Sequence, residues 1–159
     1  MRNKNLLLTT ILSLFVVSVT AFIFLNSFAD GEASSDFSNS IIDLLFLRKL
    51  LDNEIVQLVV RKAAHMIEFA GLGMSVMGLA LQLDKNYNKR IYGVAFFYVL
   101  SVAVMDEHIQ NFSLGRTSAT SDILLDFSGS MIGFLTAYLF YIVIRKLKKG
   151  KRDEKRNLS

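Results

Sequence analysis

The side chains able to do chemistry are concentrated in residues 106–126, a polar stretch between two apolar segments. A charged side chain costs about 2.5 kcal/mol or more at the centre of a membrane helix, so charges beside apolar segments usually pair, bind a ligand or face water. The stretch is therefore the first candidate for a ligand-binding or catalytic site. Its principal acidic, basic, imidazole and amide side chains are Asp106, Glu107, His108, Gln110, Arg116, Asp122 and Asp126.

A second polar cluster stands at the start of another apolar segment. There, Arg61, His65 and Glu68 are spaced i, i+4 and i+7, which places them on one stripe of a helix. Positions 106 and 110, and positions 122 and 126, repeat the i, i+4 spacing. We predict that the three stripes face one another and form an outward-facing pocket. The predicted pocket residues are Arg61, His65, Glu68, Asp106, Glu107, Gln110, Arg116, Asp122 and Asp126.

These residue types favour the binding of an anionic group. Arg61 and Arg116 could each hold a phosphate or carboxylate through paired hydrogen bonds. Acidic neighbours would orient the two arginines and accept hydrogen bonds from sugar or amine groups. The alternative is a purely structural pairing of the charges, but polar contacts between membrane helices contribute only about 0.6 kcal/mol on average. The predicted orienting residues are Glu68, Asp106, Glu107 and Asp122.

A metal-dependent hydrolase or transferase is a second interpretation of the same residues. His65 and Glu68 have the i, i+3 spacing of helical metal sites, and Glu68 or Asp106 could act as a general base with His65 as ligand or acid. The chain contains no HExxH motif and no cysteine, and the nearby arginines suit an anion better. We therefore expect no metal and no cofactor, and leave open whether the protein is an enzyme. If a metal is bound, His65 and Glu68 are the first candidate ligands, and further oxygen ligands and one imidazole could come from Asp106, Glu107, His108, Asp122 and Asp126.

The composition places the chain among membrane proteins. Of its 159 residues, 52% are hydrophobic, and they occur in long blocks. Residues 40–51 are too short to cross a bilayer, and their apolar spacing indicates a helix on the membrane surface or a cap over the bundle. The predicted fold is an all-α bundle of four transmembrane helices with an amphipathic interfacial helix in the first extracytoplasmic loop. The predicted spans are about 6–28, 61–83, 91–110 and 122–144.

The first apolar run, residues 6–28, has two possible roles. It could be a retained membrane anchor or a signal peptide that is cleaved after Ala29. Because the run is longer than the roughly 7–15 residues of a signal-peptide core, we expect a retained anchor.

The distribution of lysine and arginine predicts the orientation, because cytoplasmic loops are enriched in these residues. With the amino terminus inside, the cytoplasmic side holds 13 of the 18 basic residues: two before the first span, three in the turn at 84–90 and eight in the tail. We therefore expect both termini in the cytoplasm and both polar clusters outside. The transmembrane domain comprises residues 1–150, followed by a basic tail, 151–159, that we expect to be disordered. The tail has no interleaved aromatic residues, so nucleic acid is not an expected partner.

Gly129 and Gly133 form a small-xxx-small pair on the predicted fourth helix. Such pairs let a neighbouring helix approach closely. They predict helix packing, either inside this bundle or against another membrane protein, and the latter is a third hypothesis for the function.

Together, the motif residues resemble the VanZ-like family. The pattern is Arg61-Lys62-x-x-His65-x-x-Glu68-Phe69, Asp106-Glu107-x-x-Gln110-x-Phe112-x-x-Gly115-Arg116, and Asp122-x-x-x-Asp126-x-x-Gly129-x-x-x-Gly133. The resemblance covers about residues 6–144 and implies a small polytopic membrane protein; the name-giving member is associated with teicoplanin resistance. The chain departs from the family pattern at Phe69, Leu114 and Asp126, where Tyr, Pro and Asn are frequent. The family motif carries over to Arg61, His65, Glu68, Asp106, Glu107, Gln110, Gly115, Arg116, Asp122 and Gly129.

These observations predict a protein of the bacterial cell envelope whose pocket binds an anionic or glycosylated lipid. Expected partners are membrane lipids, including a lipid-linked cell-wall intermediate, or a lipoglycopeptide. The resemblance further implies lowered susceptibility to glycopeptides of the teicoplanin kind.

Overall fold

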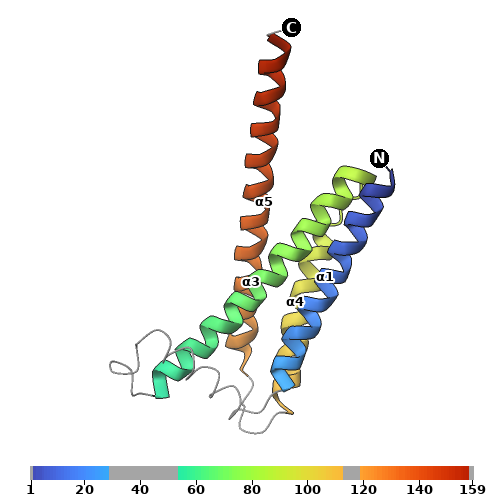
Figure 1. Cartoon of the computed structure of the whole chain (residues 1–159). Coiled ribbons are helices and arrows are strands. Elements are labelled where there is room, and N and C mark those ends of the chain that lie inside the picture. The colour runs from blue at the N-terminus through green and yellow to red at the C-terminus, as the bar shows by residue number, and fades with distance from the viewer. Residues whose placement is uncertain (1, 29–53, 113–118, 158–159) are drawn as a thin grey trace.

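The computed structural model describes residues 2–28, 54–112 and 119–157 (Figure 1). In these ranges the chain is helical apart from short turns, and no strand is present. The predicted interfacial helix at 40–51 lies outside the described residues. The four helices are α1, Arg2–Phe28; α3, Glu54–Tyr87; α4, Tyr92–Gln110; and α5, Thr120–Asn157.

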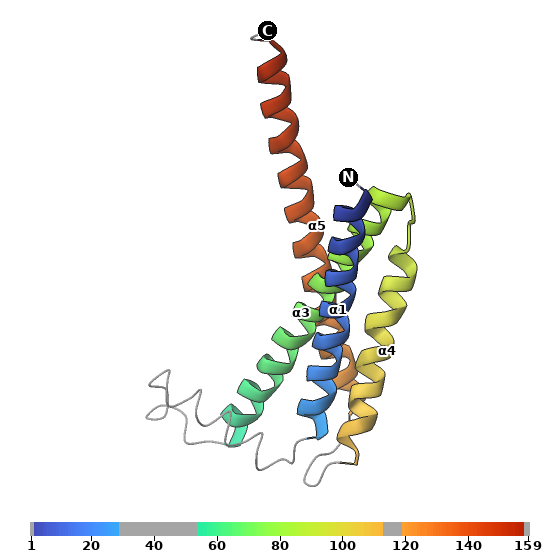
Figure 2. The ribbon, with the colours of Figure 1, turned by 45° about the vertical axis from the view of Figure 1, so that its right-hand side comes forward.

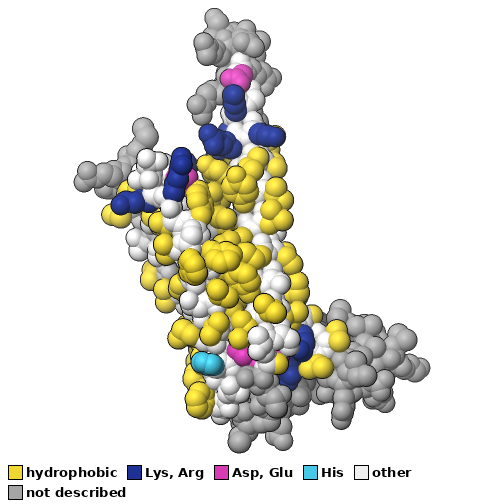
Figure 3. All heavy atoms as spheres, turned by 180° about the vertical axis from the view of Figure 1, so that it is seen from behind, with side chains coloured by type: hydrophobic (Ala, Val, Ile, Leu, Met, Phe, Trp, Pro, Cys, Tyr) yellow, Lys and Arg dark blue, Asp and Glu magenta, His cyan; other side chains and the backbone are white. Residues whose placement is uncertain are grey.

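All four helices are long and apolar enough to cross a membrane, which confirms the predicted all-α, four-span architecture. Large apolar side chains remain exposed on every helix, including Leu25, Ile67, Phe97 and Leu135, and they cover the middle of the molecule in Figure 3. In water such a surface would be unfavourable, whereas in a bilayer it faces lipid. The candidate spans are Asn5–Phe28, Leu58–Tyr87, Tyr92–Gln110 and Thr120–Gly150.

Both termini lie toward one end of the bundle, together with the turn from α3 to α4 (Figures 1 and 2). The end of α1, the start of α3, the end of α4 and the start of α5 gather at the opposite end. This up-and-down order brings the polar residues at 61–68, 106–112 and 119–126 to the same end, which we call the polar end.

Helices α3 and α5 form the most extensive helix pair, and three glycines allow their backbones to touch. A Cβ atom on Gly133 would lie 2.0 Å from the carbonyl oxygen of Ala70, and one on Gly73 would lie 2.1 Å from that of Ser130. Gly129 is similarly close to Met66. The close approach that Gly129 and Gly133 allow is therefore used inside the bundle, by α3 of the same chain, and pairing with another membrane protein stays a prediction.

The apolar core lies mainly between α1, α3 and α4. Its fully buried members include Ile23, Phe69, Leu72 and Val99. One polar contact crosses this region, where the hydroxyl groups of Thr20 and Tyr98 are 2.8 Å apart.

The turn between α3 and α4 is short and is held by local contacts. Asn88 adopts a left-handed backbone with φ of 52°, and its N–H donates to the carbonyl oxygen of Asp84 at 2.9 Å. This is the αL motif that ends many helices, and asparagine tolerates it better than most residues. The Asp84 carboxylate accepts a hydrogen bond from Tyr92 Oη at 2.8 Å and lies 3.9 Å from Arg90 Nε.

Helix α5 is longer than the sequence predicted. We expected the fourth helix to end near residue 144 and the tail beyond 150 to be disordered, but α5 continues to Asn157 and projects past the other helices (Figure 1). The added segment is rich in lysine and arginine, which are good helix formers, and it contains no proline. Its propensity therefore favours continuation of a helix that the membrane span has already nucleated.

Candidate functional site

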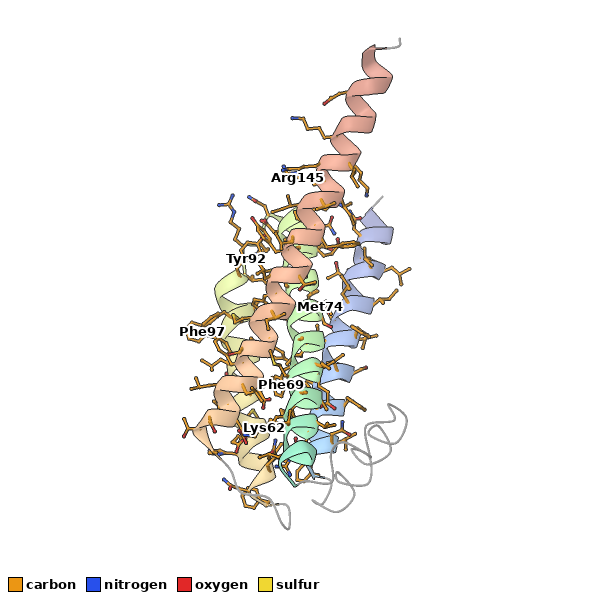
Figure 4. All side chains as sticks on the ribbon, turned by 90° about the vertical axis from the view of Figure 1, so that its left-hand side faces the viewer. Lys62, Phe69, Met74, Tyr92, Phe97 and Arg145 are labelled. Atoms are coloured by element: carbon orange, nitrogen blue, oxygen red, sulfur yellow. The ribbon has the colours of Figure 1, made fainter. Side chains whose placement is uncertain are left out.

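The two polar clusters meet at the polar end. Lys62 Nζ on α3 lies 2.5 Å from Asp122 Oδ1 in the first turn of α5, and both side chains are only partly buried. Figure 4 shows Lys62 near this end of α3, with Phe69 and Met74 progressively further into the bundle and Arg145 beyond the opposite end. Asp122 also lies in the first turn of α5, where the helix dipole stabilises a negative charge. This ion pair links the two helices at the outer edge of the site.

Asp106 is the point on which three helices converge. Its side chain is fully buried, Oδ1 accepts a hydrogen bond from Ser27 Oγ of α1 at 2.5 Å, and Oδ2 accepts one from Gln110 Nε2 at 2.7 Å. His65 Nδ1 of α3 lies 4.0 Å from the same Oδ2. The structure thus places two predicted pocket residues, Gln110 and His65, around the carboxylate of a third, Asp106.

Two α1 residues of this site were not predicted. Asn26 Nδ2 donates to Glu68 Oε1 at 2.9 Å, and Ser27 Oγ donates to Asp106. An adjacent pair of polar residues at the end of an otherwise apolar span was a usable signal, because that end lies on the same side as both clusters. Helix α1 therefore contributes hydrogen-bond donors to the site as well as anchoring the chain.

Glu107 contributes to the start of α5. Its side chain is buried, and Oε1 accepts a hydrogen bond from the N–H of Ala119, the residue before α5, at 2.6 Å. Its Oε2 is buried without a hydrogen-bond partner among the described residues. Glu107 does not line the cavity described next; it lies at the contact between α4 and the start of α5.

A small polar cavity opens between α3, α4 and α5. Its volume of about 20 Å³ is enough for one water molecule or one ion of similar size. Five of the predicted pocket residues line it, while Glu68 and Asp106 lie outside its wall and Arg116 lies outside the described residues. The lining residues are Arg61, Lys62, His65, Gln110, Asp122, Leu125 and Asp126.

Asp126 is the least satisfied group of the cavity wall. Its side chain is 2% exposed, and it makes no hydrogen bond or ion pair among the described residues. The neighbouring carboxylates of Asp106, Glu107 and Asp122 all act on it electrostatically. One ligand atom from each of His65, Asp106 and Asp126 lies within 4.8 Å of the others.

The charges of the site are separated by depth. Arg61 and Lys62 lie one helical turn closer to the end of α3 than His65, and Lys62 is about one-third exposed. Asp106 and Asp126 are almost completely buried. The site therefore has a basic mouth, formed by Arg61 and Lys62 of the cavity wall, and a buried carboxylate-rich part, formed by Asp126 of the wall and by Asp106 behind it.

A comparison with protein families gives one match to this chain. A family model described as VanZ/LLP1 matches residues 10–141, which include all of α3 and α4, parts of α1 and α5, and both polar clusters. Neither the comparison with curated proteins nor that with solved structures gives a match.

Proposed function

The chain belongs to the VanZ/LLP1 family, and from this premise we propose that it binds the anionic headgroup of an envelope lipid, or a lipoglycopeptide, at the basic mouth of its polar cavity. The observation that carries this proposal is the position of Arg61 and Lys62 on the cavity wall at one end of the membrane spans. Phosphate and sugar groups of membrane lipids lie at this depth, so a headgroup can reach both side chains without leaving the bilayer.

The cavity wall carries both basic and acidic side chains, so it suits a ligand that has anionic groups as well as hydrogen-bond donors. A phosphate or carboxylate would accept hydrogen bonds from Arg61, whose planar guanidinium can hold two oxygens at once. Sugar hydroxyls or an amine would donate to Asp122 or Asp126. Lipid-linked cell-wall intermediates and lipoglycopeptides combine these groups, which is why we propose them as the ligand class.

The small size of the cavity limits what it can enclose. A volume of about 20 Å³ holds a single polar group, so the rest of the headgroup would lie outside the cavity at the membrane surface. The acyl or prenyl chain would lie against the exposed apolar faces of the helices, such as those at Ile67 and Leu124. Altered glycopeptide susceptibility would follow from sequestering the lipid target or the drug at this position.

The proposal is tested by identifying the lipids that co-purify with the protein. Arg61→Lys should retain the charge but lose the planar fork, and we expect several-fold less anionic lipid per chain than in the wild type. Arg116→Lys is a second variant with the same expectation. Arg90→Lys, at the opposite end of the bundle, is the matched control and should retain the wild-type lipid content. Equal retention by wild type and Arg61→Lys would contradict the proposal.

A further inference from the structure

We propose that His65, Asp106 and Asp126 form a binding site for one divalent transition-metal ion, Zn²⁺ or Mn²⁺, beside the polar cavity, with His65 and Asp126 on the cavity wall and Asp106 behind it. The sequence indicated His65 and Glu68 as the first metal candidates, with several acidic residues of the segment 106–126 as further ligands. The fold selects from these sets, because it brings His65 together with Asp106 and Asp126, carboxylates of two other helices. The inference does not depend on lipid binding.

The first argument is the spacing of the ligand atoms. One atom from each of the three side chains lies within 4.8 Å of the other two. Tetrahedral coordination with bonds of about 2.1 Å places ligand atoms roughly 3.4 Å apart. Side-chain rotations that move each atom by less than about 1 Å would therefore close the site, without any displacement of α3, α4 or α5.

The second argument is independent of this spacing and concerns Asp126. Its side chain is 98% buried, lines the cavity and makes no hydrogen bond or ion pair among the residues that the structure describes. Lys62, a basic side chain on the cavity wall, forms its ion pair with Asp122 and not with Asp126. A buried carboxylate without a partner is costly, and a bound cation is one of the few groups that offset this cost.

The surroundings of Asp106 are those of a metal ligand. Ser27 and Gln110 each donate to one of its two oxygens, which fixes the plane of the carboxylate. An ionised carboxylate has about four lone-pair directions, so it can accept hydrogen bonds and bind a metal ion at the same time. Hydrogen bonds of this kind orient metal ligands and strengthen binding.

The ligand types indicate the class of metal. One imidazole and two carboxylates suit Zn²⁺ or Mn²⁺, whereas Ca²⁺ prefers six to eight oxygen ligands. Three protein ligands leave an open coordination position, and the cavity of about 20 Å³ has room for one water molecule there. Two carboxylates would also balance the charge of a divalent ion.

The experiment uses the full-length protein in detergent, stripped with a chelator and titrated separately with Zn²⁺ and with Mn²⁺. We expect one ion per chain by elemental analysis and a rise in the thermal unfolding midpoint with one of the two metals. Asp126→Asn has nearly the same shape but a weaker ligand, and we expect at least a tenfold loss of affinity. His65→Ala should show the same loss.

Asp84→Asn is the matched control, because it makes the same chemical change in a carboxylate at the other end of the bundle. It should bind the metal like the wild type. Arg61→Lys should also keep the metal, so that loss of lipid binding and loss of metal binding can be told apart. Absence of a stoichiometric ion in the wild type, or wild-type affinity in both Asp126→Asn and His65→Ala, would overturn the proposal. A rise in stability of Asp126→Asn with no ion bound in either protein would identify a protonated carboxyl group instead and would also overturn it.

Discussion

The two ends of this bundle handle their charged groups in opposite ways. At the α3–α4 turn, Asp84 is satisfied by Tyr92 and Arg90, which lie eight and six residues further along the chain. At the polar end, Ser27 bonds to Asp106 and Lys62 to Asp122, so the partners come from different helices and are far apart in sequence. The first arrangement closes a turn. The second positions several partly or fully buried groups around a cavity, which a turn does not require.

This difference identifies the end at which function is to be sought. Local charge pairs at an exposed turn form cheaply, because the chain is already folded back at that point. Buried polar contacts between separate helices must offset both desolvation and the ordering of long side chains. Such contacts add little to the stability of the bundle. Their concentration at the polar end therefore indicates a role in binding.

The largest expected effect is an all-or-none difference in chemical labelling between cysteines introduced at the two ends of the bundle. The chain has no cysteine, so a single introduced cysteine gives an unambiguous signal. Cysteine at the exposed position Asn111, at the polar end, should react with a membrane-impermeant maleimide in intact cells. Cysteine at the exposed position Lys89 should react only after permeabilisation. The reverse result would place the polar cavity in the cytoplasm.

The next largest effect is expected from separating α5 from α3. In Gly133→Leu, the new side chain would overlap the backbone of Ala70, and we expect a loss of more than about 3 kcal/mol of stability or no folded protein. Gly78→Leu, also within a span, is the control, because no atom lies within 4 Å of its Cβ position. Size-exclusion profiles and thermal unfolding measure both. Equal behaviour of the two variants would contradict the close α3–α5 contact.

A smaller effect is expected from removing one carboxylate at each end of the bundle and comparing the loss of stability. Asp106→Ala removes the acceptor of Ser27 and Gln110, and we expect a loss of about 1–3 kcal/mol. Asp84→Ala breaks partly exposed contacts and should cost less than about 1 kcal/mol. Unfolding in denaturant gives the two free energies. Asp106→Asn keeps one acceptor oxygen and should fall between them; equal losses at 84 and 106 would remove the distinction between the ends.

The spans could be predicted because each is a long apolar run, and apolar length is a strong local signal. The convergence of Arg61, His65 and Asp122 at one end followed from counting crossings, since an even number of passes returns the chain to the same side. The participation of Asn26 and Ser27 was not predicted, because the sequence does not state which face of α1 turns toward α4. Rotation of a helix about its axis is decided by packing, and packing is a property of the whole bundle.

The length of α5 was underestimated for a related reason. The expected end near 144 was placed where the apolar residues stop, which marks the membrane boundary and not the end of the helix. Similarly, Glu107 was grouped with Asp106 and Gln110 because it stands three residues before Gln110, yet the adjacent helical positions 106 and 107 point about 100° apart. Its carboxylate consequently meets Ala119 at the start of α5.

The continuous α5 also has the geometry of a lever arm. It is in contact with α3 around Gly129 and Gly133, and from that fulcrum the helix extends roughly 13 Å to Asp122 and roughly 39 Å to Asn157. To the extent that the rod stays rigid, a tilt that shifts its first turn by a given distance moves its far tip about three times as far. Binding of a ligand at the polar end that tilts α5 would thereby produce a larger displacement of the basic end of α5 at the other membrane face.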